Sequence, residues 1–192
     1  MRNVPLTMES TRIERLPRKQ HWLIIYLTQP STALQIARQT NESVDQARKL
    51  IGRLKSRGIV YCLNPGSPSS RLFWLTAKGK KVQSELLPNP INHDCPNIDW
   101  THYGAICFSH RSIVVKTLRS PMQPAAIKRV ATRNDPRIRF SANNCRDAIR
   151  FLSRIHVVKP VLERKKKFPR YELTESGKHM QRLLWQAEVK RF

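Results

Sequence analysis

The sequence predicts an α+β protein made of two copies of one small unit, in which three helices are followed by a two-stranded β-hairpin and a further helix. Residues 54–79 correspond to residues 152–177 at a constant separation of 98 positions, without a gap. Each copy passes from an apolar helical stripe through two short β-prone runs to a new helix start. The net charge of +23, which both copies share, indicates an acidic partner.

Three helices are predicted at the start of the first copy, over residues 18–28, 32–39 and 44–57. Pro30 ends the first, Ser31 is the expected N-cap of the second, and Leu34, Ile36 and Ala37 of the second should point inward. The third has apolar residues at helical spacing and Gly58 as its C-cap. Its apolar stripe consists of Val44, Ala47, Leu50, Ile51 and Leu54.

A β-hairpin and a fourth helix complete the first copy. Residues 59–63 and 71–75 are rich in β-branched and aromatic side chains, which predicts two strands. The stretch between them, residues 64–70, contains Pro, Gly and Ser and is too long for a tight hairpin turn, so we expect a projecting loop. Thr76 is the expected N-cap of the fourth helix, and the Pro-rich residues that follow position 87 are typical of a linker.

The second copy follows the same order with three differences. Residues 99–108 are apolar but without a clear period and receive no structural assignment. Seven additional residues fall within residues 131–140, predicting a longer and more basic turn before the third helix. His156 stands where the first copy has Gly58, which predicts a different end for that helix. The corresponding apolar stripe consists of Ala142, Cys145, Ala148, Ile149 and Leu152, and Thr174 is the expected cap of the final helix.

These patterns divide the chain into four parts. They are a flexible basic arm over residues 1–16, a first domain over residues 17–87, a linker and entry segment over residues 88–108, and a second domain over residues 109–192. The longest apolar run, residues 22–27, is far shorter than a bilayer span, and the N-terminus lacks the apolar core of a signal peptide. We therefore expect a cytoplasmic protein without a membrane partner, associated with the nucleoid if its source is prokaryotic.

The charge favours nucleic acid as the partner. Lys and Arg number 36 against 13 Asp and Glu, and the excess is +10 up to residue 90 and +13 after it. An excess spread over both domains is not a detachable tail, and phosphate groups are the acidic surface that it would neutralise. The alternative is a solvated basic surface, or a ribosome-type protein whose charge only packs RNA.

The segments Trp-Leu-Thr-Ala-Lys-Gly at 74–79 and Glu-Leu-Thr-Glu-Ser-Gly at 172–177 resemble the segment that follows the wing in MarR-like and ArsR-like regulators. Together with the order of elements, they make the chain similar to the winged-helix superfamily over about residues 20–87 and 109–187. The resemblance implies two tandem winged-helix domains, each with a two-stranded β wing. It also implies that the third helix of each domain enters the major groove of DNA and that each wing contacts the backbone or the minor groove.

The candidate DNA-binding residues lie on the two recognition helices and on the two wings. Arginine can read guanine or phosphate, Asn and Gln can read adenine, and a lysine at a loop tip suits phosphate, although each of these side chains could also simply be solvated. The candidates on the helices are Gln46, Arg48, Lys49, Arg53, Asn143, Asn144, Arg146, Arg150 and Arg154. The candidates on the wings are Ser69, Ser70, Arg71, Arg164, Lys165, Lys166, Lys167 and Arg170.

Metal binding and catalysis receive little support from the sequence. Cys95, His102, Cys107 and His110 include one Cys-x-x-His pair, but the second pair of a zinc site is absent. The chain lacks a phosphate-binding glycine loop, a nucleophile elbow and a metal-spaced carboxylate cluster. We therefore expect no cofactor, no resident metal and no enzymatic activity.

The sequence thus predicts a duplex DNA-binding protein, used as a site-specific transcription regulator, that engages DNA through two recognition helices and two basic wings. Three alternatives stay open: a replication or plasmid-maintenance initiator, a structured-RNA-binding protein, and a protein-interaction adaptor. Monomeric and homodimeric states are both compatible with the sequence.

Overall fold

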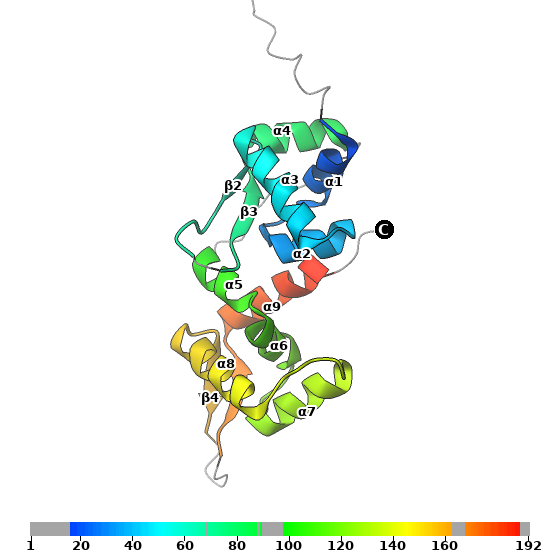
Figure 1. Ribbon diagram of the computed structural model, residues 1–192. Helices are drawn as coiled ribbons and strands as arrows, with labels where there is room; N and C mark the ends of the chain where they lie inside the picture. The colour runs from blue at the N-terminus through cyan, green and yellow to red at the C-terminus, as the bar shows by residue number, and fades with distance from the viewer. Residues whose placement is uncertain (1–15, 68, 88, 90–97, 163–167, 189–192) are drawn as a thin grey trace, which may run out of the picture.

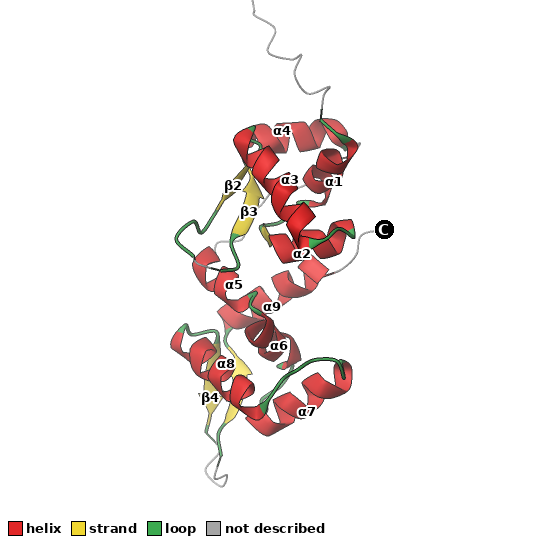
Figure 2. Cartoon of the chain, in the orientation of Figure 1, coloured by secondary structure: helices red, strands yellow, loops and turns green. Residues whose placement is uncertain are grey.

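The computed structural model of the 192-residue chain describes residues 16–67, 69–87, 89, 98–162 and 168–188. Over these residues the protein is a mixed α and β structure with nine helices and two small antiparallel sheets. Figures 1 and 2 show an elongated molecule, in which the residues up to 87 (the first half) and those from 98 onward (the second half) occupy opposite ends. Residues 1–15, and most of the predicted linker before residue 98, lie outside the described residues.

The first half consists of helices packed against a three-stranded sheet. Its helices are α1 (Arg18–Tyr26), α2 (Ala33–Thr40), α3 (Val44–Ser56) and α4 (Ala77–Leu86), and its strands are β1 (Ser31–Thr32), β2 (Val60–Cys62) and β3 (Leu72–Leu75). Strand β3 is central and pairs antiparallel with both neighbours, so that Ser31 lies opposite Phe73 and Tyr61 lies opposite Trp74.

The second half has the same order of elements after one additional helix. Its elements are α5 (Trp100–Ile106), α6 (Ser109–Thr117), α7 (Pro124–Asn134), α8 (Ala142–Arg154), β4 (Val158–Val161), β5 (Arg170–Leu173) and α9 (Glu175–Glu188). Strands β4 and β5 pair antiparallel, with Val158 opposite Leu173. A single bridge between Met122 and Tyr171 takes the place that β1 has in the first half.

Each half has an apolar core that includes the third helix of its series. The predicted stripes of α3 and α8 are buried from their second position onward, starting at Ala47 and at Cys145. Their first positions differ from the prediction, because Val44 is only half-buried and Ala142 is exposed in the first turn of the helix. Leu34, also expected to point inward, is 42% exposed, because it lies on the outer side of the first turn of α2.

Short polar residues cap α2, α3, α4, α5 and α8. The N-cap of α2 is Thr32 and not the predicted Ser31, whose hydroxyl donates a hydrogen bond to the carbonyl of Gln29. The Thr32 hydroxyl accepts from the Gln35 N–H at 3.2 Å, and the side-chain oxygen Oε1 of Gln35 accepts from the Thr32 N–H at 2.8 Å. This reciprocal capping box explains why the helix begins one residue later than expected. The predicted cap at Thr76 is confirmed.

The ends of α3 and α8 are alike, and this corrects the prediction that His156 would change the second one. Gly58 and His156 both adopt left-handed backbone conformations, with φ of 68° and 55°. The Ile59 N–H donates to the carbonyl of Leu54 at 2.9 Å, and the Val157 N–H donates to the carbonyl of Leu152 at the same distance. The turn is therefore kept although histidine tolerates a positive φ less readily than glycine.

The second half differs from the predictions for residues 99–108 and 131–140. Residues 100–106 form α5, whose Tyr103 and Ile106 are fully buried in the core of the second half. Residues 131–134 continue α7 and are not part of the predicted turn, so only the residues after Asn134 form a loop before α8. Within the described part of the chain, no helix combines the length and the apolar character that crossing a bilayer requires.

Gly79 and Gly177 lie against backbone where a side chain has no room. A Cβ atom on Gly79 would collide with the carbonyl oxygen of Ile59, and one on Gly177 would collide with that of Val157. Both glycines lie in the first turn of the last helix of their half, close to the capping threonine. The last helix of each half can therefore approach the hairpin only with glycine at this position.

We predict that Gly79→Ala and Gly177→Ala each lower the free energy of unfolding by about 1–3 kcal/mol, because the collision is with backbone that cannot move aside. The control is Gly52→Ala in α3, which has nothing within 4 Å and should raise stability by about 0.5–1 kcal/mol through helix propensity. Urea unfolding followed by circular dichroism measures both effects. Equal stability of the three variants would contradict the proposed packing.

Candidate nucleic-acid interface

Helices α3 and α8 are fixed at both ends and present a polar face to solvent. The Ser43 hydroxyl accepts from the Gln46 N–H at 3.2 Å, and the Ser141 hydroxyl accepts from the Asn144 N–H at 3.0 Å, so a serine caps each helix. Figure 1 draws both helices on the side turned to the viewer, with the strands of the second half behind α8 and with α9 between the two halves. The outer faces of the two helices can therefore meet one extended partner.

The exposed face of α3 carries four of the predicted residues. The side-chain oxygen of Gln46 accepts from the Ser43 N–H at 3.3 Å, which ties this side chain to the start of its own helix. Arg48 lies 3.0 Å from Asp45 in an exposed ion pair. Lys49 and Arg53 are exposed, and neither has an ion-pair partner within the described residues. Arg53 is therefore the least constrained guanidinium on this face.

The exposed face of α8 carries a different set of groups. Arg146 donates to the side-chain oxygen of Asn143 at 3.3 Å, and Arg150 lies 3.0 Å from Asp147. Arg154 is exposed and forms no ion pair with any described residue. These side chains extend the basic face over nearly the whole length of α8.

Asn144 does not share this outer face. It is half-buried, and its Nδ2 atom lies 3.4 Å from Nε2 of His110 in α6. Its amide therefore has a partner inside the second half and is turned away from the other predicted residues of α8.

The two outer faces are not copies of each other. At the separation of 98 residues, the position of Arg53 in α3 is taken by Phe151 in α8, and that of Gly52 is taken by Arg150. Phe151 is half-buried beneath Arg111, whose guanidinium carbon lies 3.5 Å from the ring centroid. The two helices therefore present different side chains to solvent at matching positions.

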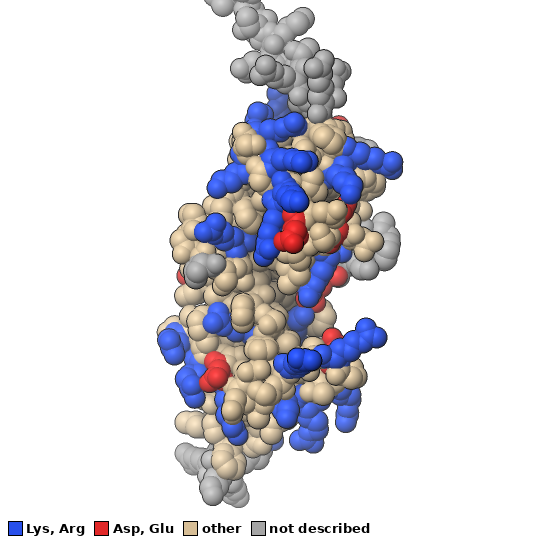
Figure 3. Space-filling view, viewed as in Figure 1, with Lys and Arg blue, Asp and Glu red and all other residues tan. Residues whose placement is uncertain are grey.

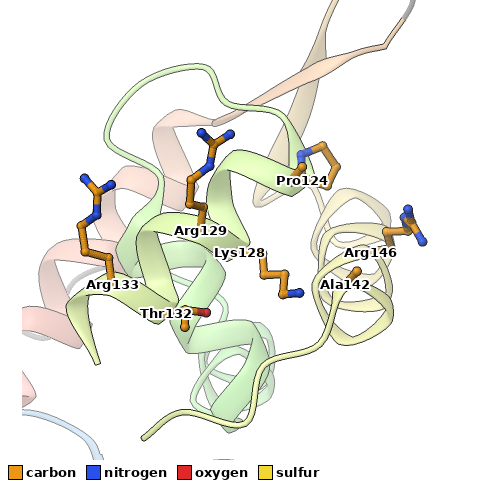
Figure 4. Close-up of a pocket in the computed structure, with 8 residues that line it drawn as sticks. Pro124, Lys128, Arg129, Thr132, Arg133, Ala142 and Arg146 are labelled. Atoms are coloured by element: carbon orange, nitrogen blue, oxygen red, sulfur yellow. The ribbon is translucent and has the colours of Figure 1, made fainter. Parts of the chain in front are cut away.

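A basic groove between α7 and α8 is the part of the site that the sequence predictions missed. The groove has a volume of about 650 Å³. It is lined by Pro124, Ala125, Lys128, Arg129, Thr132, Arg133, Ala142 and Arg146. Figure 4 shows Lys128 extending from α7 toward α8, and Arg129 and Arg133 following one another along α7. Four cationic side chains and no carboxylate line this groove, which suits a polyanion.

The sequence does contain a signal for the groove. Lys128, Arg129, Thr132 and Arg133 recur three and four residues apart, so a helix places them on adjacent positions of one face. Because residues 131–140 were predicted to form a turn, Thr132 and Arg133 were not assigned to the same helix as Lys128 and Arg129. The basic face of that helix was therefore not predicted.

The loop between β2 and β3, which carries Ser69, Ser70 and Arg71, is folded back onto α5. Buried Asn64 accepts from the Leu72 N–H at 2.7 Å and donates to the Ser70 carbonyl at 3.4 Å. Ser70 is half-buried with φ of 53°, whereas Ser69 and Arg71 are exposed. Figure 1 shows this loop reaching α5. The predicted first wing therefore serves in the packing between the halves, and only part of its surface is open to a partner.

The predicted second wing is described only at its base. Arg164, Lys165, Lys166 and Lys167 lie outside the described residues. Arg170 is half-buried in β5, opposite Val161. Leu162 and Phe168, on either side of the undescribed residues, are 84% and 62% exposed.

The candidate metal ligands have separate partners. His102 lies 3.2 Å from Asp99, and Cys107 is near Gln35 at 3.8 Å. His110 is beside Asn144, and Cys95 is outside the described residues. Among the residues that the structure does describe, no three His, Cys, Asp or Glu side chains come together in a way that could hold a metal ion.

Figure 3 shows where the charge lies on the side of the molecule that carries α3 and α8. Lys and Arg gather over α1, α3 and α4 at one end and over α7 and α8 at the other, with few acidic side chains among them. The site thus consists of two basic areas on one side of an elongated molecule, each centred on a helix that is anchored in a core.

We predict that Cys107 and Cys145 react with iodoacetamide at pH 8 about 100-fold or more slowly in the folded chain than in the unfolded one, because the thiolate is the nucleophile. Burial raises the pKa of Cys107 to about 12 and that of Cys145 to about 11, so both thiols stay protonated at this pH. Raising the pH through 10 should therefore speed their alkylation. Mass spectrometry of the cysteine-containing peptides measures the rates, and rapid labelling of Cys145 at pH 8 would contradict its place in the core.

The functional site is thus described by the charged side chains of α3, of α8 and of the groove between α7 and α8. The chain matches no protein-family model, no curated protein and no solved structure.

Proposed function

We propose that the chain is a duplex DNA-binding protein made of two tandem winged-helix units, and that it acts as a site-specific transcription regulator. One observation carries the proposal. Each half holds a helix, α3 or α8, whose apolar stripe is buried and whose outer face is basic, and both helices lie on one side of the molecule. DNA offers a row of phosphates and a major groove wide enough to admit one α-helix at each of two places.

The order of elements supports the winged-helix part of the proposal. Helices α2 and α3 are joined by a short turn in which Asn41 has a left-handed φ of 55°. This is the compact connection expected of a helix-turn-helix, in which the second helix reads the major groove and the first crosses the DNA backbone. In chain order the hairpin after each third helix corresponds to a wing, although the loop of the first hairpin packs on α5.

The groove between α7 and α8 has a specific role in this proposal. In a helix-turn-helix the first helix crosses the DNA backbone next to the recognition helix. Lys128, Arg129 and Arg133 belong to the corresponding first helix, α7, and line its groove with α8 without a carboxylate among the lining residues. Their charges are therefore placed to neutralise phosphates, a contact that contributes affinity and positions α8 without carrying sequence information.

Sequence recognition would depend on the guanidinium groups of the outer faces. Arg53 has no partner among the described residues, and Arg150 has only an exposed pair with Asp147. An exposed ion pair is worth little, so the Arg150 guanidinium can exchange Asp147 for a guanine edge at small cost.

We predict that Arg129→Ala with Arg133→Ala lowers the affinity for a random-sequence duplex and reduces the slope of log affinity against log salt by about 2, because two phosphate contacts are lost. The matched control is Lys178→Ala with Arg182→Ala, which removes the same charge from α9. Titration of a labelled duplex at several salt concentrations measures the slope. An equal loss in both double variants would mean that the groove has no special contact with DNA.

We further predict that Arg53→Ala and Arg150→Ala relax the base preference at different positions of the bound site, each by about 1–3 kcal/mol of discrimination. Arg119→Ala, which removes an exposed charge outside α3 and α8, should leave base preference unchanged. Binding of duplexes carrying single base changes, at one salt concentration, measures this. A structured RNA that displaces the duplex at equal concentration would instead favour the RNA-binding alternative.

A further inference from the structure

The two halves share part of a core. Leu72, at the start of β3 in the first half, is fully buried in the apolar cluster of the second half, together with Tyr103 and Ile106 of α5. Gly104 of the same helix lies so close to Asn64 and Ser70 of the first loop that a Cβ on it would collide with the Asn64 amide. Separation of the halves would therefore expose large apolar side chains and open a closely packed contact.

A second attachment joins the halves at α2 and α9. The side chain of Gln39 donates to the carbonyl of Ala187 at 2.9 Å, and that of Gln29 donates to the carbonyl of Leu183 at 3.0 Å. These amides bridge the first half and the last helix of the second through part-buried hydrogen bonds.

A carboxylate adds an ion-pair cluster to this attachment. Glu188 of α9 lies 2.8 Å from Lys116 of α6 and 3.5 Å from Arg38 of α2. Its side chain and that of Lys116 are mostly covered, at 27% and 22% exposure, so solvent screens this pair less than the exposed pairs on α3 and α8. One carboxylate thus connects three helices from the two halves.

Two attachments at separate places prevent the two halves from rotating relative to each other as well as from separating. A single flexible linker would let each DNA-binding unit find its own site at variable distance. Here Asn64, Ser70 and Leu72 are held by α5, and α2 is held by α9, so a turn of one half about either contact would break the other. The outer faces of α3 and α8 consequently keep one relative position.

We propose that the chain recognises one composite DNA site, made of two different half-sites at a single fixed spacing. This inference rests on the proposed function and adds the class of site to it. The fixed spacing follows from the two attachments between the halves. The difference between half-sites follows from the unlike outer faces, in which Arg53 of α3 is replaced by Phe151 at the matching position of α8.

Insertions between the half-sites test the fixed spacing. A duplex is first selected from a random pool with the full chain, and footprinting locates its two protected segments. An insert of about five base pairs, half a helical turn, turns the second half-site to the far side and should lower affinity roughly 100-fold. An insert of about ten base pairs restores the phase but adds about 34 Å, and should not restore affinity.

The outcomes separate the inference from the function on which it rests. Equal affinity for all inserts would overturn the fixed spacing while leaving DNA binding intact. Two identical protected sequences would overturn the unlike half-sites. A chain that selects no duplex contradicts the proposed function, and the inference fails with it.

A variant of the attachment gives a second measurement. Gln39→Ala with Glu188→Ala removes contacts between α2 and α9, and should reduce the penalty of the five-base-pair insert by about tenfold as the halves gain freedom. The matched control, Glu175→Ala with Gln186→Ala, changes exposed side chains of α9 and should keep the full penalty. A full penalty in both double variants would overturn the role of this attachment. Circular dichroism checks that each variant is folded, and the insert series on the unaltered chain decides the question if one is not.

Discussion

The geometry of each half depends on one backbone carbonyl group. In the first half it belongs to Ile59, and in the second half it belongs to Val157. The Ile59 oxygen accepts from the Thr76 N–H at 3.0 Å, and the Val157 oxygen accepts from the Thr174 N–H at 3.1 Å. The hydroxyl of each threonine donates to the carbonyl one residue earlier, at 2.7 Å for Gly58 and 2.8 Å for His156, and also lies near the Ile59 or Val157 oxygen. The glycine three residues after each threonine lies against the same carbonyl. Because this carbonyl follows the third helix and begins the hairpin, one contact fixes the last helix, the hairpin and the end of the third helix together. The recurring Leu-Thr-x-x-Gly sequence is the chemical requirement of that contact.

This constraint bears directly on how α3 and α8 can function. A serine caps each helix at its start, and the turn at Gly58 or His156 is bonded back to it at its end. The apolar stripe of each helix lies on its inner face. The helix therefore cannot slide or rotate without exposing core side chains to solvent. Side chains on the outer face are therefore presented in a fixed register. A rigid backbone of this kind lowers the entropic cost of binding, which is what groove recognition by a few guanidinium groups requires.

The features predicted from the sequence are those that local chemistry determines. The helices, the hairpins and the threonine caps follow from periodicity and from hydrogen bonds that span a few residues. Helix α5 was missed because its seven residues gain their stability from long-range contacts, with Tyr103 and Ile106 covered by distant segments. The replacement of Gly58 by His156 was expected to change the end of α8, but it does not. The hydrogen bonds of the turn after the helix outweigh the moderate cost of a positive φ in histidine. The groove was missed because the interpretation of residues 131–140 as a turn separated Thr132 and Arg133 from Lys128 and Arg129. Its other wall comes from α8, which no spacing along the chain places beside α7.

The two halves are thus alike at the residues that pack in their own cores. They differ at residues that face solvent or contact the other half. In the first half, the loop after β2 satisfies its polar groups through Asn64 and packs on α5, so little of it is left to bind a phosphate. In the second half, the matching hairpin projects away from the first half (Figure 1), and a basic groove lies beside α8. Within the proposed function, phosphate contacts then come mainly from the second half, whereas the loop of the first half serves to hold α3 in place. The first loop thus packs against the second half and fixes the position of the first half relative to it, and under the proposed function this would let α3 and α8 recognise one DNA site together.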